Sequence, residues 1–111
     1  DIIIRGGENI SCIEVESAIY AHPDVGEASV FGLADERYGE VPGAVFLPEE
    51  GCDLDPDDLC AFLKGQLAPF KLPARIWKVS EPLPRLGTEK VDKVTLRKQY
   101  GEIWKSEQAG G

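Results

Sequence analysis

The 111-residue sequence contains no methionine, one histidine (His22) and only three cysteines (Cys12, Cys52 and Cys60). The cysteines form no close pair and lack metal-ligand spacing, and a single histidine argues against a zinc site. Reduced thiols in a cytosolic protein are the simplest interpretation, so we expect a cytoplasmic location and no bound metal. The missing methionine fits either removal of an initiator or excision from a longer protein. The strand-like Asp-Ile-Ile-Ile start favours excision.

Basic residues are also scarce, because 12 lysines and arginines face 20 aspartates and glutamates, a net charge of -8. Sequence-independent binding to nucleic acid or to an anionic membrane needs a basic surface, so we expect neither partner. No apolar run approaches the roughly 18 residues of a membrane span, so we expect no transmembrane segment. What remains is an ordinary globular composition, 42% hydrophobic and 29% charged, with a length that fits one domain.

The pattern of apolar and turn residues predicts a small α+β domain. We expect a sheet of about three main strands with a short N-terminal β-hairpin, packed by about three helices. The main strands are expected at 27–31, 41–47 and 74–80. A charged loop is expected at 32–40, and a frayed tail at 101–111.

Helix signals mark the three expected helices. Ser11 and Glu14 form a capping-box pattern that opens the first helix, which His22-Pro23 stops. The second helix is expected to start at Asp55-Pro56, with aspartate as N-cap and proline at the first helical position, and to end at Pro69. The third is expected from residue 92 to about residue 100.

Three segments offer chemistry, and each has an ordinary structural explanation when taken alone. RGGEN (5–9) is explained by a glycine turn, although glycines also let a main chain approach a thin ligand. DERYG (35–39) is explained by a solvated turn in which Tyr38 covers a little core. In APFKLP (68–73), Phe70 more often caps a core than stacks on a nucleotide, whereas Lys71 beside it is able to meet a phosphate.

A fourth segment, PRLGTEKVDK (84–93), carries Lys90. Most lysines lie on the surface without a specific role. Here Pro82 and Pro84 precede the lysine and would stiffen its loop, which suits a lysine whose position matters. The sequence has no Ser/His/Asp set and no Cys-His nucleophile pair, so these residues predict half of a site rather than a complete one.

Four segments in order resemble the C-terminal domain of adenylate-forming enzymes, in particular the acyl-CoA synthetase branch, and together they cover residue 1 to about residue 97. They are DIIIRGGENIS with IEVE after it, FGLADERYGEVPGAVFLP, LAPFKLPARI and LPRLGTEKVDKVTLR. The GGEN form with Asn9 is typical of acyl- and aryl-CoA ligases, whereas amino-acid-activating domains of peptide synthetases usually carry an arginine-containing version. VTLRKQY is similar to bacterial fatty-acyl-CoA ligases.

The resemblance implies an ATP-dependent acid–CoA ligase, with a fatty acid as substrate, that uses ATP, Mg²⁺ and CoA. Such enzymes join a carboxylate to AMP and then transfer the acyl group to CoA. Residues 1–100 would be the mobile C-terminal domain, whose partner is a large N-terminal domain absent from this sequence. The hinge would lie just before Asp1. The isolated domain is therefore expected to be inactive and to bind none of these ligands alone.

The resemblance also implies roles for individual residues. Lys90 matches the lysine that bridges the carboxylate and the α-phosphate during adenylation. The family usually has glycine before this lysine, whereas this chain has Glu89, which is able to draw the ammonium aside or to face solvent. Leu72 stands where some relatives have a basic residue. The residues expected to line the pantetheine tunnel or to contact CoA are Gly6, Gly7, Glu8, Tyr38, Phe70 and Lys71.

Two alternatives remain open at this stage. The acyl group is either passed to CoA or, in a rival interpretation, to a carrier protein; the GGEN form favours CoA. The chain is also consistent with a non-catalytic binding module of the same fold, but such a module needs neither Lys90 nor the Gly6-Gly7 pair.

Overall fold

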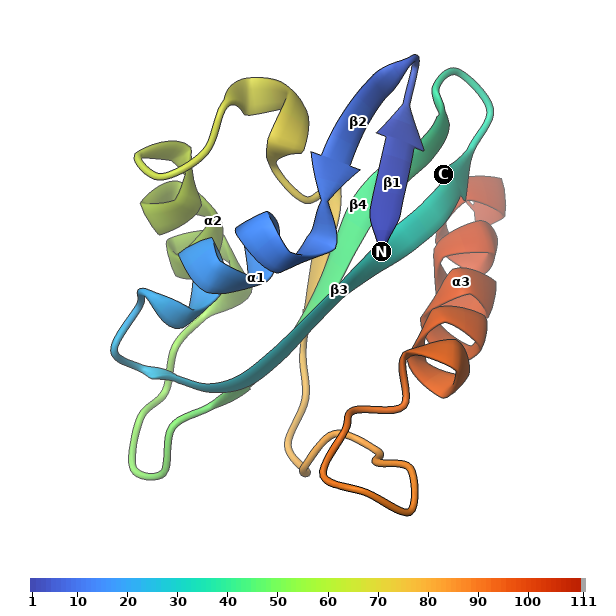
Figure 1. Cartoon of the computed structure of the whole chain (residues 1–111). Helices are drawn as coiled ribbons and strands as arrows, with labels where there is room; N and C mark the ends of the chain where they lie inside the picture. Colours follow the sequence, from blue (N-terminus) through green and yellow to red (C-terminus); the bar gives the residue numbers. More distant parts are fainter. Residues whose placement is uncertain (111) are drawn as a thin grey trace.

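The computed structural model describes residues 1–110 and contains one five-stranded mixed sheet (Figure 1). The strands are β1 (Ile2–Arg5), β2 (Glu8–Ser11), β3 (Val25–Asp35), β4 (Gly39–Pro48) and β5 (Arg75–Lys78). β3 pairs antiparallel with the whole length of β4, while β1 and β5 pair with β4 at separate places, antiparallel and parallel respectively. The predicted α+β class, with three main strands and an N-terminal hairpin, is confirmed.

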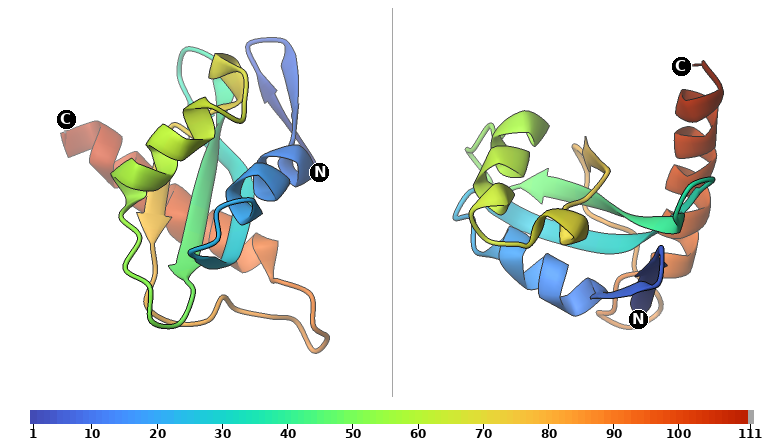
Figure 2. Two further views of the ribbon diagram at one scale, coloured as in Figure 1. Left: turned by 90° about the vertical axis from the view of Figure 1, so that its left-hand side faces the viewer. Right: turned by 90° about the horizontal axis from the view of Figure 1, so that it is seen from above.

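Helices cover both faces of the sheet (Figure 2). They are α1 (Cys12–Tyr20), α2 (Pro56–Lys64) and α3 (Lys93–Gly110), and a single 3₁₀ turn, η1, spans Pro69–Lys71. The side chains of β4 alternate between the faces: Phe46 packs with α1 and α2, whereas Val45 packs with α3. The sheet is thus the middle layer between two apolar clusters. The prediction that about three helices pack on it is confirmed.

The first two helices begin where the sequence predicts. The Ser11 hydroxyl accepts a hydrogen bond from the Glu14 N–H (3.2 Å) and caps α1. Asp55 and Pro56 occupy the N-cap and first helical position of α2, although the Asp55 side chain makes no capping hydrogen bond. α2 ends at Lys64, however, so the prediction that it continues to Pro69 is wrong; the residues around Pro69 form η1 instead.

The predicted loop at 32–40 is also wrong in most of its length. β3 continues to Asp35 and β4 resumes at Gly39, which leaves a three-residue turn. Antiparallel pairing holds this extension, and Leu33, opposite Val41, is 1% exposed beneath α3. The Asp35 carboxylate closes the turn by accepting the N–H groups of Arg37 (3.0 Å) and Tyr38 (2.8 Å). The prediction failed because the charged residues of this segment suggest a solvated loop, whereas its apolar residues alternate with them and are buried on one face of a strand.

The third helix is longer than predicted. α3 runs from Lys93 to Gly110, so the expectation of a frayed tail after residue 100 is wrong up to Gly110; residue 111 lies outside the described residues. Trp104 explains the extension, because its side chain is 8% exposed and its Nε1–H donates to the Ala34 carbonyl oxygen (2.8 Å). One turn further on, Glu107 forms an ion pair with Arg75 of β5 (3.0 Å).

Candidate functional site

The glycine pair forms the tip of the β1–β2 hairpin. Gly6 has a φ of +56° and Gly7 a φ of +90°, values that side-chain-bearing residues rarely adopt. The Gly6 N–H donates to the Tyr38 carbonyl oxygen (2.8 Å), and a Cβ on Gly6 would lie 3.1 Å from the Tyr38 ring. A Cβ on Gly7 would meet nothing within 4 Å. The turn is therefore fixed on the Gly6 side and open on the Gly7 side.

Tyr38 lies against this hairpin, so the structure brings two of the predicted segments together. The Arg5 guanidinium carbon is 3.8 Å from the centre of the Tyr38 ring, and that of Arg37 is 5.2 Å away. Both distances are within the range of cation–π attraction. Glu8 is exposed and lies opposite Arg5 in the hairpin register. Arg5 is not among the residues predicted from the sequence, although an arginine directly before a glycine turn is a visible signal for a cation at the tip.

Phe70 and Lys71 lie in η1, beside α1 rather than in the hairpin. Phe70 is half-buried and packs against the core cluster of α1 and α2, as its ordinary structural explanation predicts. The Lys71 ammonium lies 2.9 Å from both carboxylate oxygens of Glu14. This pairing takes up the Glu14 side chain, which therefore does not complete the capping box with Ser11. A phosphate would have to compete with Glu14 for Lys71.

Lys90 lies on a tight loop in the segment that connects β5 to α3, shortly before α3 begins. An isolated bridge pairs Arg85 with Val91, and the Leu86 N–H donates to the Lys90 carbonyl oxygen (3.0 Å). The Lys90 N–H in turn donates to the Thr88 hydroxyl (3.2 Å). The loop is therefore a short hairpin, and Lys90 lies just after its tip. Backbone hydrogen bonds hold this hairpin in addition to the two preceding prolines.

The base of this loop is fixed to the rest of the domain. The Arg85 guanidinium forms an ion pair with Glu27 of β3 (2.8 Å), and Leu83 is 4% exposed in the cluster under α3. Lys90 and Glu89 are both exposed, and within residues 1–110 neither side chain forms an ion pair. Glu89 therefore does not hold the Lys90 ammonium in this structure.

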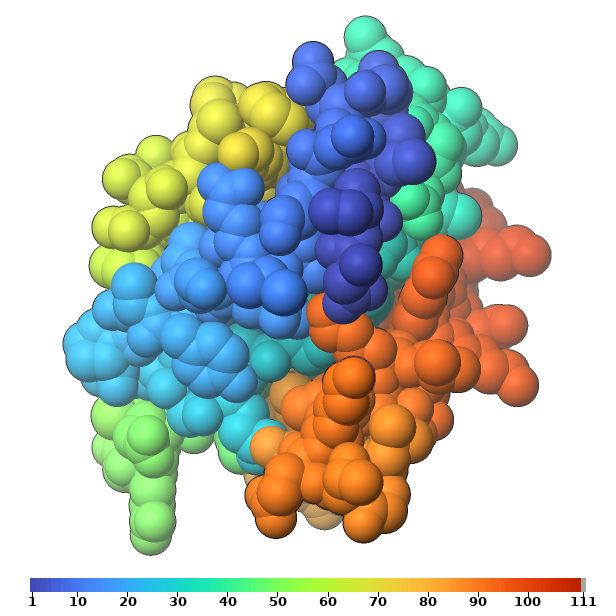
Figure 3. All heavy atoms as spheres, viewed as in Figure 1, coloured from blue at the N-terminus to red at the C-terminus, as the bar shows by residue number. Residues whose placement is uncertain are grey.

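The glycine turn and the Lys90 loop lie at opposite ends of the domain. In Figure 1 the β1–β2 tip and the β3–β4 turn meet at the top, while the loop through residues 84–92 hangs at the bottom. The space-filling view shows the same separation, with the blue hairpin above and the orange loop below (Figure 3). The structure thus brings Gly6, Gly7, Glu8 and Tyr38 into one cluster and keeps Lys90 apart from it.

Two of the cysteines, Cys12 and Cys52, are not activated for nucleophilic chemistry. Burial raises the pKa of the Cys12 thiol, and partial burial followed by the hydrogen bond to Asp24 raises that of Cys52. All three cysteines are free thiols.

Residues 1–110 contain no group of three or more His, Cys, Asp or Glu side chains able to hold a metal ion, and none of their helices is long and apolar enough to cross a membrane.

Comparison with known proteins places these features in a family. The model of the AMP-binding enzyme C-terminal domain matches residues 14–90. The feruloyl-CoA synthase of an Amycolatopsis species is 41% identical over 101 residues, which are 91% of this chain and 20% of that protein. The chain spans about a fifth of the length of the curated relatives that it matches.

Solved structures agree on the fold. The structure of apo MatB from Rhodopseudomonas palustris superposes with a TM-score of 0.86 at 38% identity, over 94% of this chain and 21% of that one. A Mycobacterium tuberculosis fatty acyl CoA synthetase gives a TM-score of 0.84 at 36% identity, over 93% of this chain and 20% of that one. Both comparisons match the described domain to a small part of a larger enzyme.

Proposed function

Because the chain belongs to the AMP-binding enzyme C-terminal domain family, we propose that it is the mobile C-terminal domain of an AMP-forming carboxylic acid–CoA ligase. Its partner is a large N-terminal domain that binds the acid and most of the ATP. The enzyme works in two steps. A carboxylate oxygen attacks the α-phosphorus of ATP and pyrophosphate leaves; the CoA thiol sulfur then attacks the acyl carbon and AMP leaves.

Lys90 acts in the first step. Its ammonium bridges the carboxylate and the α-phosphate, and it offsets the negative charge that accumulates as one anion attacks another. Two features of the loop suit this role: the side chain is exposed with no ion pair within residues 1–110, and the backbone around it is hydrogen-bonded. The group is thus free to meet a new anion, while its base is held in place.

The glycine turn acts in the second step. Gly6 and Gly7, with Glu8 beside them, line the tunnel through which the pantetheine thiol reaches the acyl carbon. A side chain there would narrow the tunnel, and Gly7 already projects into open space. Tyr38 lies next to the turn, with Arg5 against its ring, and is the aromatic side chain that would lie near CoA. Phe70 and Lys71 contact its nucleotide end, which requires Lys71 to exchange Glu14 for a phosphate.

One observation carries this proposal: the two candidate sites occupy opposite ends of one domain (Figure 1). A site that needed both at once would bring them together. Two steps that need them in turn are served by a domain that rotates between them. Separation of the sites is also what distinguishes this enzyme from a binding module of the same fold, which needs neither.

The ligands follow from the same proposal. ATP and CoA are substrates that bind between this domain and the N-terminal domain. Mg²⁺ would enter bound to the phosphates of ATP, as is usual for this ion. The proposed acid is a fatty acid, supported by the VTLRKQY segment and by the likeness to a fatty acyl CoA synthetase. The feruloyl relative at a similar identity makes the aromatic acids the first competitors to assay. A cytoplasmic location is proposed from the free thiols.

The test is Lys90→Ala in the enzyme that contains both domains. Loss of one preorganised cation costs on the order of 10²–10³ in rate, or roughly 3–4 kcal/mol. Pyrophosphate release should fall by at least that factor, while transfer from supplied acyl-adenylate to CoA should be nearly unchanged. Lys64→Ala, which removes an exposed lysine of α2, is the matched control and should leave both steps intact. Equal loss in both steps by a folded Lys90→Ala enzyme would contradict the proposal.

The acceptor is tested separately. Product analysis with free CoA and with a phosphopantetheinylated carrier protein should give thioester with free CoA. Transfer only to the carrier protein would support the rival interpretation instead.

A further inference from the structure

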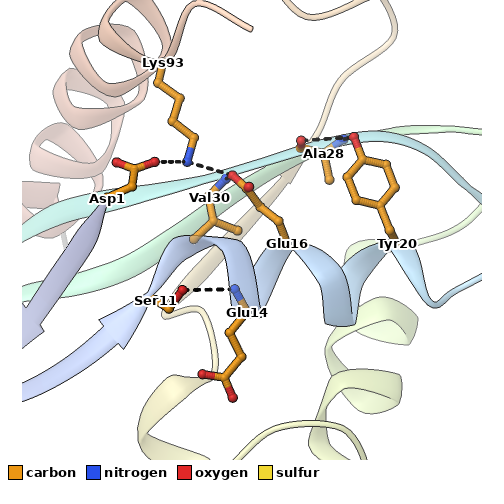
Figure 4. A network of polar contacts seen from close by, with 8 residues as sticks. All are labelled: Asp1, Ser11, Glu14, Glu16, Tyr20, Ala28, Val30 and Lys93. Carbon is orange, nitrogen blue, oxygen red and sulfur yellow. Dashed lines mark hydrogen bonds and ion pairs between the residues drawn. The ribbon is translucent and has the colours of Figure 1, made fainter. Parts of the chain in front are cut away.

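A second lysine lies three residues beyond Lys90 and is held in a different way. The Lys93 ammonium lies 2.7 Å from an Asp1 carboxylate oxygen and 2.8 Å from a Glu16 carboxylate oxygen, and its side chain is 27% exposed. The same Glu16 oxygen accepts the N–H of Val30 (2.9 Å). Figure 4 shows this junction, in which the first residue of α3 meets the start of β1, the helix α1 and the strand β3.

The position of Lys93 is unfavourable for a lysine unless it has such partners. The N-terminus of a helix carries a partial positive charge, so a cation in the first turn is repelled and an anion is favoured. Asp92 fits that rule, because its carboxylate accepts from the N–H (3.1 Å) and the hydroxyl (2.7 Å) of Thr95. Lys93 goes against it, and two carboxylates from other elements compensate. The lysine therefore connects elements rather than stabilising the helix itself.

The junction also lies where the Lys90 loop rejoins the domain. The Asp92 N–H donates to the Pro84 carbonyl oxygen (2.8 Å), so both strands of the loop close next to Lys93. Three residues span at most about 10 Å, so the anchor is within one short segment of Lys90. On the opposite side of the loop, Arg85 is paired with Glu27. The loop is thus held on both sides by charged side chains, and Lys90 lies on its returning strand, directly after the tip at residues 87–89.

We propose that Lys93 is a positioning residue for Lys90: by holding the base of the loop against Asp1 and Glu16, it fixes where the Lys90 ammonium points in the adenylation step. The inference rests on the proposed function of Lys90. In this proposal Lys93 acts through Lys90 and not on a substrate, since its ammonium joins carboxylates of two other parts of the domain, Asp1 and Glu16. Displacement of a reacting group by about 1 Å can cost on the order of 100-fold in rate, so loss of the anchor should weaken catalysis without weakening binding.

The experiment compares four variants of the enzyme that contains both domains: Lys93→Met, Lys93→Arg, Lys78→Met and Lys90→Ala. Lys78→Met is the matched control, because Lys78 also pairs with an aspartate, Asp53, at 2.7 Å, but this pair joins β5 to the segment before α2 and not to the returning strand of the loop. For each variant, kcat and KM for ATP are measured by pyrophosphate release, and thioester formation is measured from supplied acyl-adenylate.

Lys93→Met should lower kcat for adenylation by about 10- to 100-fold, with KM and thioester formation within about twofold of wild type. Lys93→Arg should recover most of the loss, since a guanidinium is also able to bridge two carboxylates. Lys78→Met should match wild type. Wild-type adenylation by Lys93→Met, equal loss in both steps, or no recovery by Lys93→Arg would each overturn the inference.

Two further measurements keep the outcomes separate. If Lys93→Met does not fold, Asp1→Asn removes one of the two carboxylates and should give a smaller loss with the same selectivity for adenylation; a loss shared by both steps would overturn the inference. Lys90→Ala reports on the proposed function itself. If Lys90→Ala abolishes adenylation and Lys93→Met does not, only the role of Lys93 is wrong; if Lys90→Ala has no effect, the proposed function is wrong as well.

Discussion

Gly7 allows the effects of backbone strain and of side-chain bulk to be separated. Its φ of +90° lies outside the range that residues with a Cβ adopt readily, so any substitution costs on the order of 1–3 kcal/mol of stability. A Cβ at Gly7 meets no atom within 4 Å, so the surrounding structure adds no clash. Gly7→Ala and Gly7→Leu should therefore be destabilised by similar amounts.

The free-energy cost of the strain determines how far the melting temperature should fall. For a domain of about 100 residues, 1 kcal/mol shifts Tm by roughly 4–8 °C, so both variants should melt about 5–20 °C below wild type. Leucine then adds three carbons beyond the alanine methyl. In the intact enzyme we expect Gly7→Leu to lower thioester formation by at least about 100-fold, because the thiol no longer reaches the acyl carbon at its reacting distance. Gly7→Ala should lose far less, and pyrophosphate release should be unchanged in both.

The assays are a thermal melt of each variant and the two half-reactions measured separately below the melting temperature. A Gly7→Leu enzyme that transfers to CoA as fast as Gly7→Ala would refute the tunnel role of the turn. A Gly7→Ala variant as stable as wild type would show that the positive φ of Gly7 does not destabilise a substituted residue, and it would leave the tunnel role of the turn untouched. Slow pyrophosphate release in Gly7→Leu would show that the glycine turn also serves adenylation.

Three further predictions concern the domain itself. The isolated 111 residues should fold but show no tight binding of Mg-ATP in calorimetry; tight binding would contradict a divided site. Trp104→Ala should cost about 3–5 kcal/mol in denaturant unfolding, because it empties a buried site and leaves the Ala34 carbonyl without its donor; a loss under about 1 kcal/mol would mean that the end of α3 contributes little. The Arg75 hydrogen bond lowers the pKa of Glu107, so its stabilisation should be complete above the unfolded pKa of about 4.3 and disappear as pH falls through the lower folded value. The free energy of unfolding of Glu107→Gln should therefore be lower than that of wild type at pH 7, and the two values should converge in acid.

The sequence predicted the fold where local signals and buried contacts agree. The cap at Ser11 and the proline at position 56 mark helix starts that tertiary packing leaves in place. The ends were harder to predict. The end of α3 depends on a hydrogen bond from Trp104 to Ala34, which lies 70 residues earlier in the sequence, and the spacing of apolar residues does not reveal such a distant partner. The extension of β3 likewise depends on pairing with β4 and burial under α3.

The candidate site divides along the same line. Glycines at a hairpin tip and a lysine after prolines are local patterns, and the structure places both where a local reading expects them. The contact between Gly6 and Tyr38 joins residues from two hairpins, and the pair of Lys71 with Glu14 spans 57 positions. Neither partner is specified by its neighbours in the sequence. Lys93 was missed for the same reason, because only the fold brings Asp1 and Glu16 to it.

The size of the domain decides how Lys90 and Gly7 are able to serve one substrate. The body measures 38 × 33 × 28 Å, and the loop and the hairpin tip lie at opposite ends of it. The loop is closed by the Arg85–Val91 bridge, and the tip is held by the Gly6 hydrogen bond to Tyr38, so neither can extend far without breaking its own contacts. If both residues act on the same acyl group, the whole domain has to turn between the two steps. Cross-linking the domain to its N-terminal partner in one orientation should then allow one half-reaction and block the other; an enzyme that catalyses both steps while cross-linked would show that loop motion is enough.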